Sequence, residues 1–170
     1  MILTHRPVAE QDLAAICAFT QSPAELFYCF PKADFPLSPE QLQVAIDQRS
    51  DSTVVLLDGV VVAFANFYRW ETGGVCAIGN VMVAPAARGR GVARYLLEQM
   101  LATAFSRHQA CEVQVSCFNQ NVAGLLLYPQ LGFLPCGVEE RAGKGGERLA
   151  LIHFQRSAAA LSRLPAGSAG

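Results

Sequence analysis

The sequence has few charged residues and no long apolar run. Charged side chains make up 16% of the 170 residues, and the formal net charge is -1. The cationic residues are scattered from Arg6 to Arg163 instead of being gathered in one segment, which argues against nucleic acid or a membrane surface as a partner. The longest apolar runs, such as Val60 to Ala65, are far too short to span a bilayer. We therefore expect no nucleic-acid partner and no membrane insertion.

Paired metal-binding and disulfide motifs are also missing. No C-x-x-C pair occurs, and the three histidines are isolated from one another and from closely spaced cysteines, which argues against a zinc site. No secretory signal peptide is recognisable, so disulfides are not expected. We expect a cytoplasmic protein without a metal, whose cysteines are reduced core residues. The six cysteines are Cys17, Cys29, Cys76, Cys111, Cys117 and Cys136.

The length and composition predict one folded domain. Hydrophobic residues make up 52% of the chain, which is typical of a domain with an apolar interior. A chain of 170 residues is the right size for a single core. From Ser157 onward the sequence is rich in Ala, Ser and Gly. We therefore predict a single domain over residues 1–156, followed by a flexible tail over residues 157–170.

Hydrophobic periodicity predicts alternating strands and helices. The pair Asp58-Gly59 between two β-branched runs predicts a hairpin, and Ser38-Pro39 followed by Gln41 predicts a helix start. Apolar residues recur at steps of three and four from Val92 onward, which predicts an amphipathic helix. This order predicts an α+β fold with helices on the faces of a mixed sheet. The expected strands are 2–4, 53–57, 60–68, 75–83, 111–117, 133–138 and 149–154, and the other expected helices are 9–19 and 119–131.

Residues 20–37 combine prolines with aromatic side chains. Three prolines interrupt this segment, which predicts a loop. Phe27, Tyr28 and Phe30 lie within it. Their rings either fold down as a lid over the core or line a substrate pocket, and the sequence favours neither interpretation.

A glycine turn connects an apolar strand to the amphipathic helix. Gly89 and Gly91 have no side chains, so backbone N–H groups there can approach an anion closely, and the helix N-terminus adds partial positive charge. The guanidinium groups of Arg88 and Arg90 could neutralise further phosphate oxygens. The turn therefore predicts a pyrophosphate site.

Two nucleotide-binding motifs do not fit this turn. A P-loop requires a lysine and then a serine or threonine after its last glycine, and Val92-Ala93 stands there instead. A dinucleotide fingerprint requires a third glycine where Arg94 is found. Neither an ATP-type nor an NAD-type site is expected.

The glycine turn resembles the acetyl-CoA motif of the GNAT superfamily of N-acetyltransferases. That motif is Gln/Arg-x-x-Gly-x-Gly/Ala, and Arg88, Gly91 and Ala93 match it. The V-x-P that precedes it in the family is present as Val83-Ala84-Pro85. The order of the expected elements fits the family over nearly the whole chain.

A second motif strengthens the resemblance. The family signature Asn-x-x-Ala-x-x-Leu-Tyr, followed by Gly-Phe, is similar to the segment from Asn121 to Tyr128 and the pair Gly132-Phe133. Gly124 replaces the usual alanine, and Pro129 directly follows the tyrosine. Because proline inside a helix removes a hydrogen bond, this helix could kink or end near the tyrosine and change the position of the phenol.

The resemblance implies a fold and a co-substrate. The fold is a mixed, mostly antiparallel central sheet of about seven strands, with helices on both faces and a splay between the fourth and fifth strands. Gly79-Asn80 offers a place for the bulge that would open this splay. The co-substrate is acetyl-CoA, and no metal is implied.

The resemblance also implies roles for particular residues. Tyr128 would protonate the departing CoA thiolate, a role that suits the chemistry of a phenol. The β-strand backbone would pair with the pantetheine arm, the glycine turn would hold the pyrophosphate, and an asparagine would contact the thiol end. The cofactor-binding residues implied are Val81, Met82, Val83, Arg88, Gly89, Arg90, Gly91, Val92, Ala93 and Asn121.

The general base is left open at this point. Glu112 and Glu71 are carboxylates that could take a proton from the amine, although such residues are more often solvated turn charges. Asn80 or Ser116 could instead order a water molecule that relays the proton.

The sequence thus predicts an N-acetyltransferase that acts on a primary amine of a small molecule, amino acid or peptide, with Phe27, Tyr28 and Phe30 near the acceptor. An acetyl-CoA-binding regulatory module without turnover is the alternative, and a non-catalytic interaction protein is a third hypothesis. A homodimer is common among members of this family, and the sequence leaves the oligomeric state open.

Overall fold

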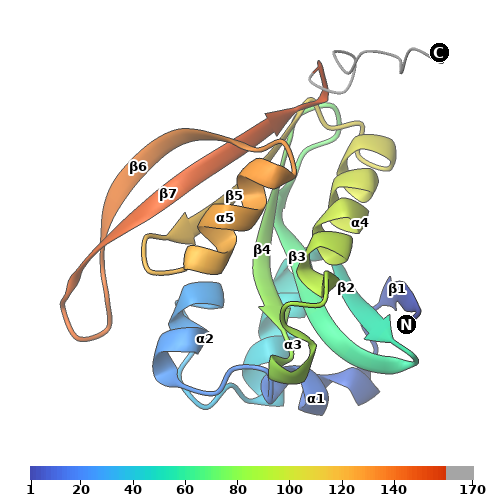
Figure 1. Ribbon diagram of the computed structural model, residues 1–170, viewed down its shortest axis with the longest axis vertical. Coiled ribbons are helices and arrows are strands. Elements are labelled where there is room, and N and C mark those ends of the chain that lie inside the picture. Colours follow the sequence, from blue (N-terminus) through green and yellow to red (C-terminus); the bar gives the residue numbers. More distant parts are fainter. Residues whose placement is uncertain (160–170) are drawn as a thin grey trace.

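A seven-stranded sheet forms the centre of the protein in the computed structural model, which describes residues 1–159 (Figure 1). The strand order is β1-β2-β3-β4-β5-β7-β6. All neighbouring strands are antiparallel except β4 and β5, which are parallel. The prediction of a mixed, mostly antiparallel sheet is confirmed. The strands are β1 (Leu3–Pro7), β2 (Ser50–Leu57), β3 (Val60–Trp70), β4 (Val75–Val83), β5 (Glu112–Phe118), β6 (Leu134–Ala142) and β7 (Arg148–Ser157).

Helices cover both faces of the sheet, as predicted. The helices α4 (Val92–Ser106) and α5 (Val122–Gln130) bury one face. The helices α1 (Leu13–Cys17), α2 (Pro23–Cys29) and α3 (Pro39–Gln48) bury the other. Short 3-10 turns, η1 (Glu10–Asp12) and η2 (Pro85–Ala87), precede α1 and the glycine turn.

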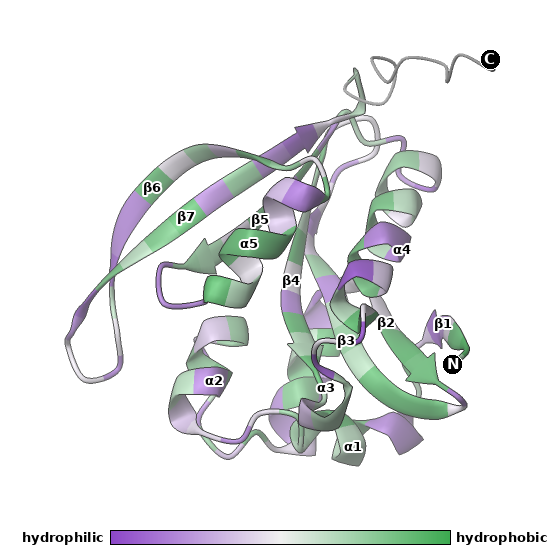
Figure 2. Ribbon diagram, viewed as in Figure 1, coloured by the Kyte–Doolittle hydropathy of each residue, from purple (hydrophilic) through white to green (hydrophobic). Residues whose placement is uncertain are grey.

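The alternation of side chains in β3 builds the two cores. Ala63, Ala65 and Phe67 face α4, whereas Phe64 faces α1 and α3, because successive strand residues point to opposite faces. All four of these side chains are fully buried. Figure 2 shows that β2 and β3 are mostly hydrophobic, as expected for strands covered on both faces.

The sheet opens between β4 and β5. Their parallel register runs only from Val75 and Glu112 to Ile78 and Val115, although both strands continue. Just beyond this point Asn80 has a φ of +50°, and the β3–β4 register shifts, which marks a β-bulge. The predicted splay, and its predicted bulge, are therefore confirmed.

The segment 20–37 contains a helix that the prolines had argued against. Pro23 occupies the first turn of α2, where a missing N–H does no harm, and the Ser22 side chain accepts a hydrogen bond from the backbone N–H of Glu25. The same arrangement of Ser38 and Pro39 starts α3. A serine followed by a proline, the pattern of a helix start, is visible in the sequence before both helices. The prediction of a loop was therefore wrong for 23–29. The first expected helix, 9–19, is shorter than predicted and consists of η1 and α1.

The β6–β7 hairpin extends from the end of the sheet and curves toward α2 (Figure 1). Every residue of β6 is exposed. At the hairpin tip, the Lys144 ammonium donates to the Ala33 carbonyl and lies 3.1 Å from the Asp34 carboxylate, both in the α2–α3 connection. The tip therefore closes one side of the space between α2 and the splayed strands.

Two further expectations concern the ends and the membrane. Of the predicted tail, 157–170, residues 157–159 complete β7 and a short turn, and the rest lies outside the described residues. Within residues 1–159, none of the helices combines the length and the apolar character needed to cross a bilayer.

Candidate functional site

A cleft of about 560 Å³ opens where β4 and β5 separate. Its walls come from β4, the glycine turn, α2 and α5. The structure brings most of the predicted site residues together there. The predicted residues that line the cleft are Tyr28, Val81, Met82, Val83, Arg88, Gly89, Gly91, Val92, Ala93, Asn121 and Tyr128, whereas Phe27, Phe30 and Arg90 are outside its lining.

The glycine turn forms a cradle at one end of the cleft. Gly89 and Gly91 have φ of +72° and +77°, a conformation that favours glycine. No atom lies within 4 Å of where a Cβ would stand at either position, so the space above the turn is open. Gly91 is the N-cap of α4, and no side chain caps this helix end. The first N–H groups of α4 and its dipole are therefore available to an anion, and the cradle fits a pyrophosphate.

The guanidinium of Arg88 is directed toward α2 instead of the helix end. It lies 3.1 Å from a carboxylate oxygen of Glu25 and donates to the carbonyls of Phe19 and Val83, each at 3.3 Å. The Arg88 guanidinium holds the pKa of the Glu25 carboxyl below its usual range. This contact joins the glycine turn to α2 across the cleft. Arg90 lies outside the cleft lining, and its guanidinium is 3.9 Å from the Met1 sulfur.

The unpaired edge of β4 forms the floor of the cleft. Val83 and Met82 pair with β3 through one edge of the strand, and β5 pairs with the other edge only as far as Ile78. The backbone groups of β4 beyond Ile78 therefore face the cleft without a β5 partner. An extended chain could bind there as an added strand.

Tyr128 lies on the α5 side of the cleft and is almost entirely buried. Its ring packs edge-on against Phe133 and Phe154, at centroid distances of 6.0 and 5.6 Å. Burial raises the pKa of the Tyr128 phenol above its usual value. The phenol therefore stays protonated at neutral pH and can act as a proton donor.

Pro129 does not displace this tyrosine. The helix α5 continues through Pro129 and ends at Gln130, so the proline lies in the last turn. At the start of α5, the Asn121 side chain accepts a hydrogen bond from the Gly124 N–H at 3.1 Å. A Cβ on Gly124 would stand 3.2 Å from the Tyr128 ring. Glycine in place of the usual alanine thus allows the ring to pack closely against α5.

The three aromatic residues of α2 and its C-cap have different surroundings. Phe30 is buried in the core beneath α1 and α3. Phe27 packs against Phe118 of β5 at 4.9 Å between centroids. The Tyr28 hydroxyl donates to the Gln120 side chain at 3.0 Å, and Tyr28 lines the cleft. One of the three predicted acceptor residues is therefore a core residue, one packs on β5, and one faces the cleft.

A buried polar chain supports the bulge in β4, and sequence reasoning missed it. Arg49 donates to Asn66 at 3.1 Å, Asn66 donates to Asn80 at 3.0 Å, and Asn80 donates to the Cys29 carbonyl at 3.0 Å. Asn66 and Asn80 are both buried. An asparagine in the middle of each of two apolar strands was the available signal. The chain ties the end of α2 to the bulge.

Thr20, beside the cleft, carries a polar atom without a protein partner within residues 1–159. The Thr20 hydroxyl is buried, and its oxygen has no hydrogen-bond partner among the described residues. Thr20 lines the cleft beside Phe19. A buried hydroxyl of this kind favours a bound molecule with polar groups.

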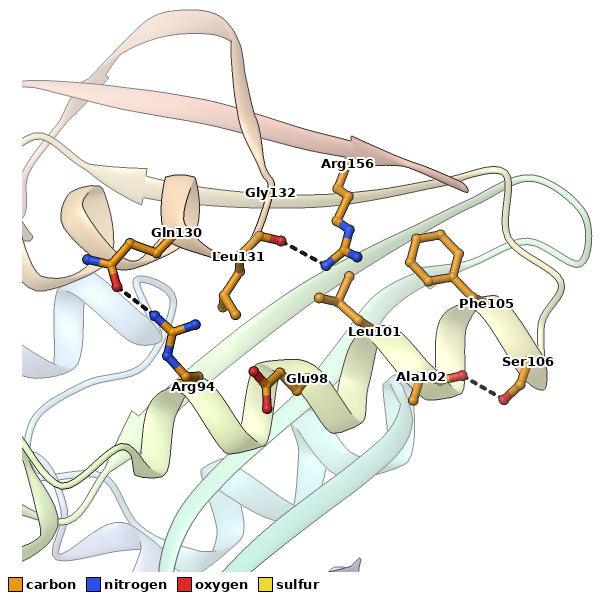
Figure 3. Close-up of a pocket in the computed structure, with 10 residues that line it drawn as sticks. All are labelled: Arg94, Glu98, Leu101, Ala102, Phe105, Ser106, Gln130, Leu131, Gly132 and Arg156. Atoms are coloured by element: carbon orange, nitrogen blue, oxygen red, sulfur yellow. Dashed lines mark hydrogen bonds between the residues drawn. The ribbon is translucent and has the colours of Figure 1, made fainter. Parts of the chain in front are cut away.

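A neighbouring cavity of about 840 Å³ lies between α4, the end of α5 and β7 (Figure 3). Arg94 and Gln130 line both this cavity and the cleft, and their side chains are hydrogen-bonded at 2.6 Å. On the other side of the cavity, Arg156 donates to the Leu131 carbonyl and lies over the Phe105 ring. The cleft therefore continues past the first turn of α4 into a cavity with a guanidinium group on either side.

The two carboxylates considered as general bases lie far from the open part of the splay. Glu71 is at the β3–β4 turn, where Arg69 and the Val75 N–H hold its carboxylate. Glu112 begins β5 and pairs with Val75, at the closed end of the parallel register. Within residues 1–159, no group of three or more His, Cys, Asp or Glu side chains is arranged to hold a metal ion.

Comparison with known proteins identifies relatives of this arrangement. A sequence model described as the acetyltransferase (GNAT) family matches residues 15–133, well over half of the chain. The structure is similar to ribosomal-protein-alanine N-acetyltransferase from Brucella melitensis, with a TM-score of 0.74 and 23% identity over 91% of this chain and 99% of that chain. It is also similar to yncA from Salmonella typhimurium, solved with its cofactor acetyl-CoA, with a TM-score of 0.72 and 22% identity over 92% and 94% of the two chains. At these identities the two structures establish a shared fold.

Proposed function

We infer the reaction from the premise that this chain belongs to the acetyltransferase (GNAT) family, whose acyl donor is acetyl-CoA. The chain is an N-acetyltransferase, and we propose that its acceptor is the primary amine of a small molecule, an amino acid or a peptide. One observation carries the proposal: the splay between β4 and β5 places an open strand edge, an anion cradle and a buried phenol around one cleft.

We propose that acetyl-CoA binds this cleft in an extended form, with its pantetheine arm along Val81, Met82 and Val83 as an added strand. The backbone N–H groups from Gly89 to Ala93 would hold the pyrophosphate, and Asn121 would contact the thiol end. Arg88 and Arg90 belong to the same turn, with the side chain of Arg88 holding α2 in place.

The adenosine part of the co-substrate would continue along α4. Arg94 lies in the first turn of α4 and borders both cavities, which supports the proposal that its guanidinium binds the 3′-phosphate. Gln130, now bonded to Arg94, is the neighbouring polar group. The two cavities together would then hold the whole nucleotide.

The chemistry requires an oxyanion site and a proton donor. Backbone N–H groups on the bulged part of β4 would stabilise the negative charge that develops on the thioester oxygen. Tyr128 would donate its proton to the sulfur as the C–S bond breaks. The acceptor amine would enter between α2 and the β6–β7 hairpin, where Tyr28 lines the cleft and Phe27 packs beside it.

Two properties of the proposal concern the molecule in the cell. All six cysteines are free, which supports the proposed cytoplasmic location, although Cys111 and Cys136 are exposed and the expectation that all six lie in the core was wrong for them. A homodimer, common in the family, is proposed for solution and is tested by sedimentation.

The second candidate function is an acetyl-CoA sensor without turnover. It is favoured because, among the described residues that line the cleft, the carboxylate is that of Glu25, which is already ion-paired with Arg88.

The substitution Tyr128→Phe separates these functions. We expect thiol release from acetyl-CoA, assayed with a panel of free amino acids, dipeptides and polyamines, to fall about 100-fold in kcat because the proton donor is lost. The affinity for acetyl-CoA, measured by calorimetry, should be retained because the pyrophosphate cradle is unchanged.

The matched control is Tyr95→Phe, since Tyr95 lies outside the cleft lining and bonds His5 of β1. It should keep the rate of the wild type. A wild-type protein that binds acetyl-CoA but releases no thiol with any amine of the panel would establish the sensor function instead.

A further inference from the structure

Three polar side chains on the neighbouring strands β5, β7 and β6 form a chain of contacts. The Ser116 hydroxyl lies 2.7 Å from Nδ1 of His153, and Nε2 of His153 lies 3.3 Å from a carboxylate oxygen of Glu139. Ser116 stands directly opposite His153 in the β5–β7 register, and Gly137 stands opposite His153 on β6. Because Glu139 is two residues from Gly137, all three side chains project from one face of the sheet.

Glu139 determines which ring nitrogen of His153 carries the proton. Arg141 donates to the Glu139 carboxylate at 2.8 and 3.1 Å and lowers the pKa of that carboxyl, so Glu139 is ionised and only accepts hydrogen bonds. We therefore assign the ring proton of His153 to Nε2, the nitrogen on the side of Glu139. Nδ1 presents a lone pair to the Ser116 hydroxyl, which donates to it. The chain is therefore oriented to pass a proton from Ser116 toward His153.

Ser116 stands at the mouth of the splay. The last paired residues of β4 and β5 are Ile78 and Val115, so Ser116 is the first β5 residue without a β4 partner. On the β4 side, the next residues are Gly79 and the bulged Asn80. The Ser116 hydroxyl thus lies where the strands begin to separate, next to the bulge whose backbone would face the thioester.

The Ser116 side chain faces the side of the sheet that α2 covers. Val115 belongs to the core beneath α4, so its neighbour Ser116 points the opposite way, as does Phe118. Phe118 packs on Phe27 of α2. Tyr128, in contrast, belongs to the core on the α4 and α5 side. The proposed proton donor and the Ser116 hydroxyl therefore flank the splay from opposite faces.

We propose that Ser116 and His153 form the relay that removes a proton from the acceptor amine, with Glu139 as a positioning residue. This inference rests on the proposed N-acetyltransferase function. Amines of the lysine type have a pKa of about 10 and enter as ammonium ions, which cannot attack a carbonyl. Glu71 and Glu112 both lie beside Val75, at the end of β4 where the strands are still paired, and cannot reach the open splay. The relay supplies the base that they do not.

The proton transfers balance. The ammonium gives a proton to Oγ of Ser116 while Ser116 passes its own proton to Nδ1 of His153, and Glu139 stabilises the imidazolium. The amine nitrogen then forms a C–N bond with the thioester carbon, the C–S bond breaks, and the thiolate takes the proton of Tyr128. The second proton that the nitrogen loses as the amide forms replaces the proton of Tyr128, and His153 releases its proton to water.

The test is the substitution His153→Gln, which removes the proton acceptor and keeps a group that can hydrogen-bond with Ser116. The probe is the amine of the panel that gives the fastest wild-type thiol release. We expect kcat/KM for this amine to fall about 100-fold, while the Kd for acetyl-CoA changes by less than about twofold. The matched control is His5→Gln, because His5 contacts Tyr95 between β1 and α4 and touches none of the three relay residues, and it should keep wild-type kcat/KM.

The pH profile distinguishes proton transfer from support of the fold. In the wild type, kcat/KM should rise with pH because the relay needs an unprotonated base, and His153→Gln should lose this rise. The charged groups that face His153 are Glu139 and its partner Arg141 on β6. Nitrogen-15 NMR of the wild-type imidazole should show the Nε2–H tautomer of His153, and Glu139→Gln should give a mixture of tautomers.

The possible failures are distinguishable. An active wild type whose His153→Gln variant keeps both its rate and its pH dependence would overturn the relay and leave the acetyltransferase function intact. An Nδ1–H tautomer in the wild type would also overturn the relay. A wild type that releases thiol with no amine of the panel would overturn the proposed function and the relay together.

Discussion

At the scale of single residues, the backbone of Gly91 links local conformation to binding. Its φ of +77° is one that other residues rarely adopt, and the space above it is open. Any side chain at this position would strain the turn and would also fill the anion cradle. Glycine is needed here for both reasons, and the two effects can be measured separately.

The substitution Gly91→Ala should lower the free energy of unfolding by about 1 to 2 kcal/mol because of the left-handed conformation. It should also weaken acetyl-CoA binding about tenfold, which corresponds to roughly one charge-assisted hydrogen bond of 1.5 kcal/mol. Denaturant unfolding and calorimetry measure the two effects.

The control is Gly59→Ala, in the β2–β3 hairpin, where φ is +86° and the space around a Cβ is equally open. It should cost similar stability and leave the acetyl-CoA affinity unchanged. Equal losses of affinity in both variants would contradict the placement of the pyrophosphate at Gly91.

At the scale of elements, α2 is held to two parts of the site. Its Glu25 is ion-paired with Arg88 of the glycine turn, and its last residue, Cys29, accepts a hydrogen bond from Asn80 in the bulge of β4. The helix is only seven residues long, so these contacts and its cap position it more than its own helical stability does. The wall of the cleft opposite α5 therefore depends on side-chain contacts between elements.

If Arg88 acts mainly by holding α2, then Glu25→Gln and Arg88→Gln should have similar effects. Each should lower stability by about 0.5 to 1 kcal/mol, as expected for a partly exposed ion pair, and the double variant should be no worse than either one. Thermal unfolding and acetyl-CoA calorimetry on the wild type, the two single variants and the double variant form a double-mutant cycle that measures the coupling. A tenfold loss of acetyl-CoA affinity in Arg88→Gln alone would show instead that its guanidinium binds the phosphates directly.

At the scale of the whole molecule, one sheet separates two cores, and the cleft lies where that sheet opens. The core beneath α4 and α5 holds Tyr128, and the core beneath α1, α2 and α3 holds Phe64. The first connection of the chain, between β1 and α1, is fastened by Asp12, which is almost entirely buried. Arg6 donates to the Asp12 carboxylate at 2.6 and 2.9 Å, and the Ala9 N–H donates at 2.8 Å.

This carboxylate should make stability depend on pH. The Arg6 guanidinium holds the pKa of Asp12 below its usual range, so its contribution is complete above the unfolded pKa of about 3.9 and is lost as the pH falls through the lower native pKa. Asp12→Asn should therefore cost about 1 to 3 kcal/mol at pH 7 and progressively less below pH 4. Denaturant unfolding of the wild type and the variant, at pH 7 and again below pH 4, measures how the cost of the substitution changes. Asp47→Asn, at an exposed position of α3, should cost little at either pH, and a cost for Asp12→Asn that did not shrink in acid would contradict this account.

The sequence by itself determined the elements and the cradle of this protein. Periodicity placed β4 and predicted α4 from Val92 onward, and Gly89 with Gly91 predicted an anion site, because each of these signals depends on residues close in the chain. The prolines hid α2, since the same residue type can interrupt a helix or begin one, and the cap at Ser22 decided between them.

Only the tertiary structure decided which distant side chains meet. The pairs Arg88 with Glu25 and Ser116 with His153 join residues 63 and 37 positions apart, and neither contact leaves a pattern in the sequence. Their partners depend on strand register and on the packing of α2, which arise from the sum of many weak contacts across the sheet. For that reason the anion cradle could be predicted from a motif, whereas the contacts proposed to carry the amine proton depend on the assembled β5, β7 and β6.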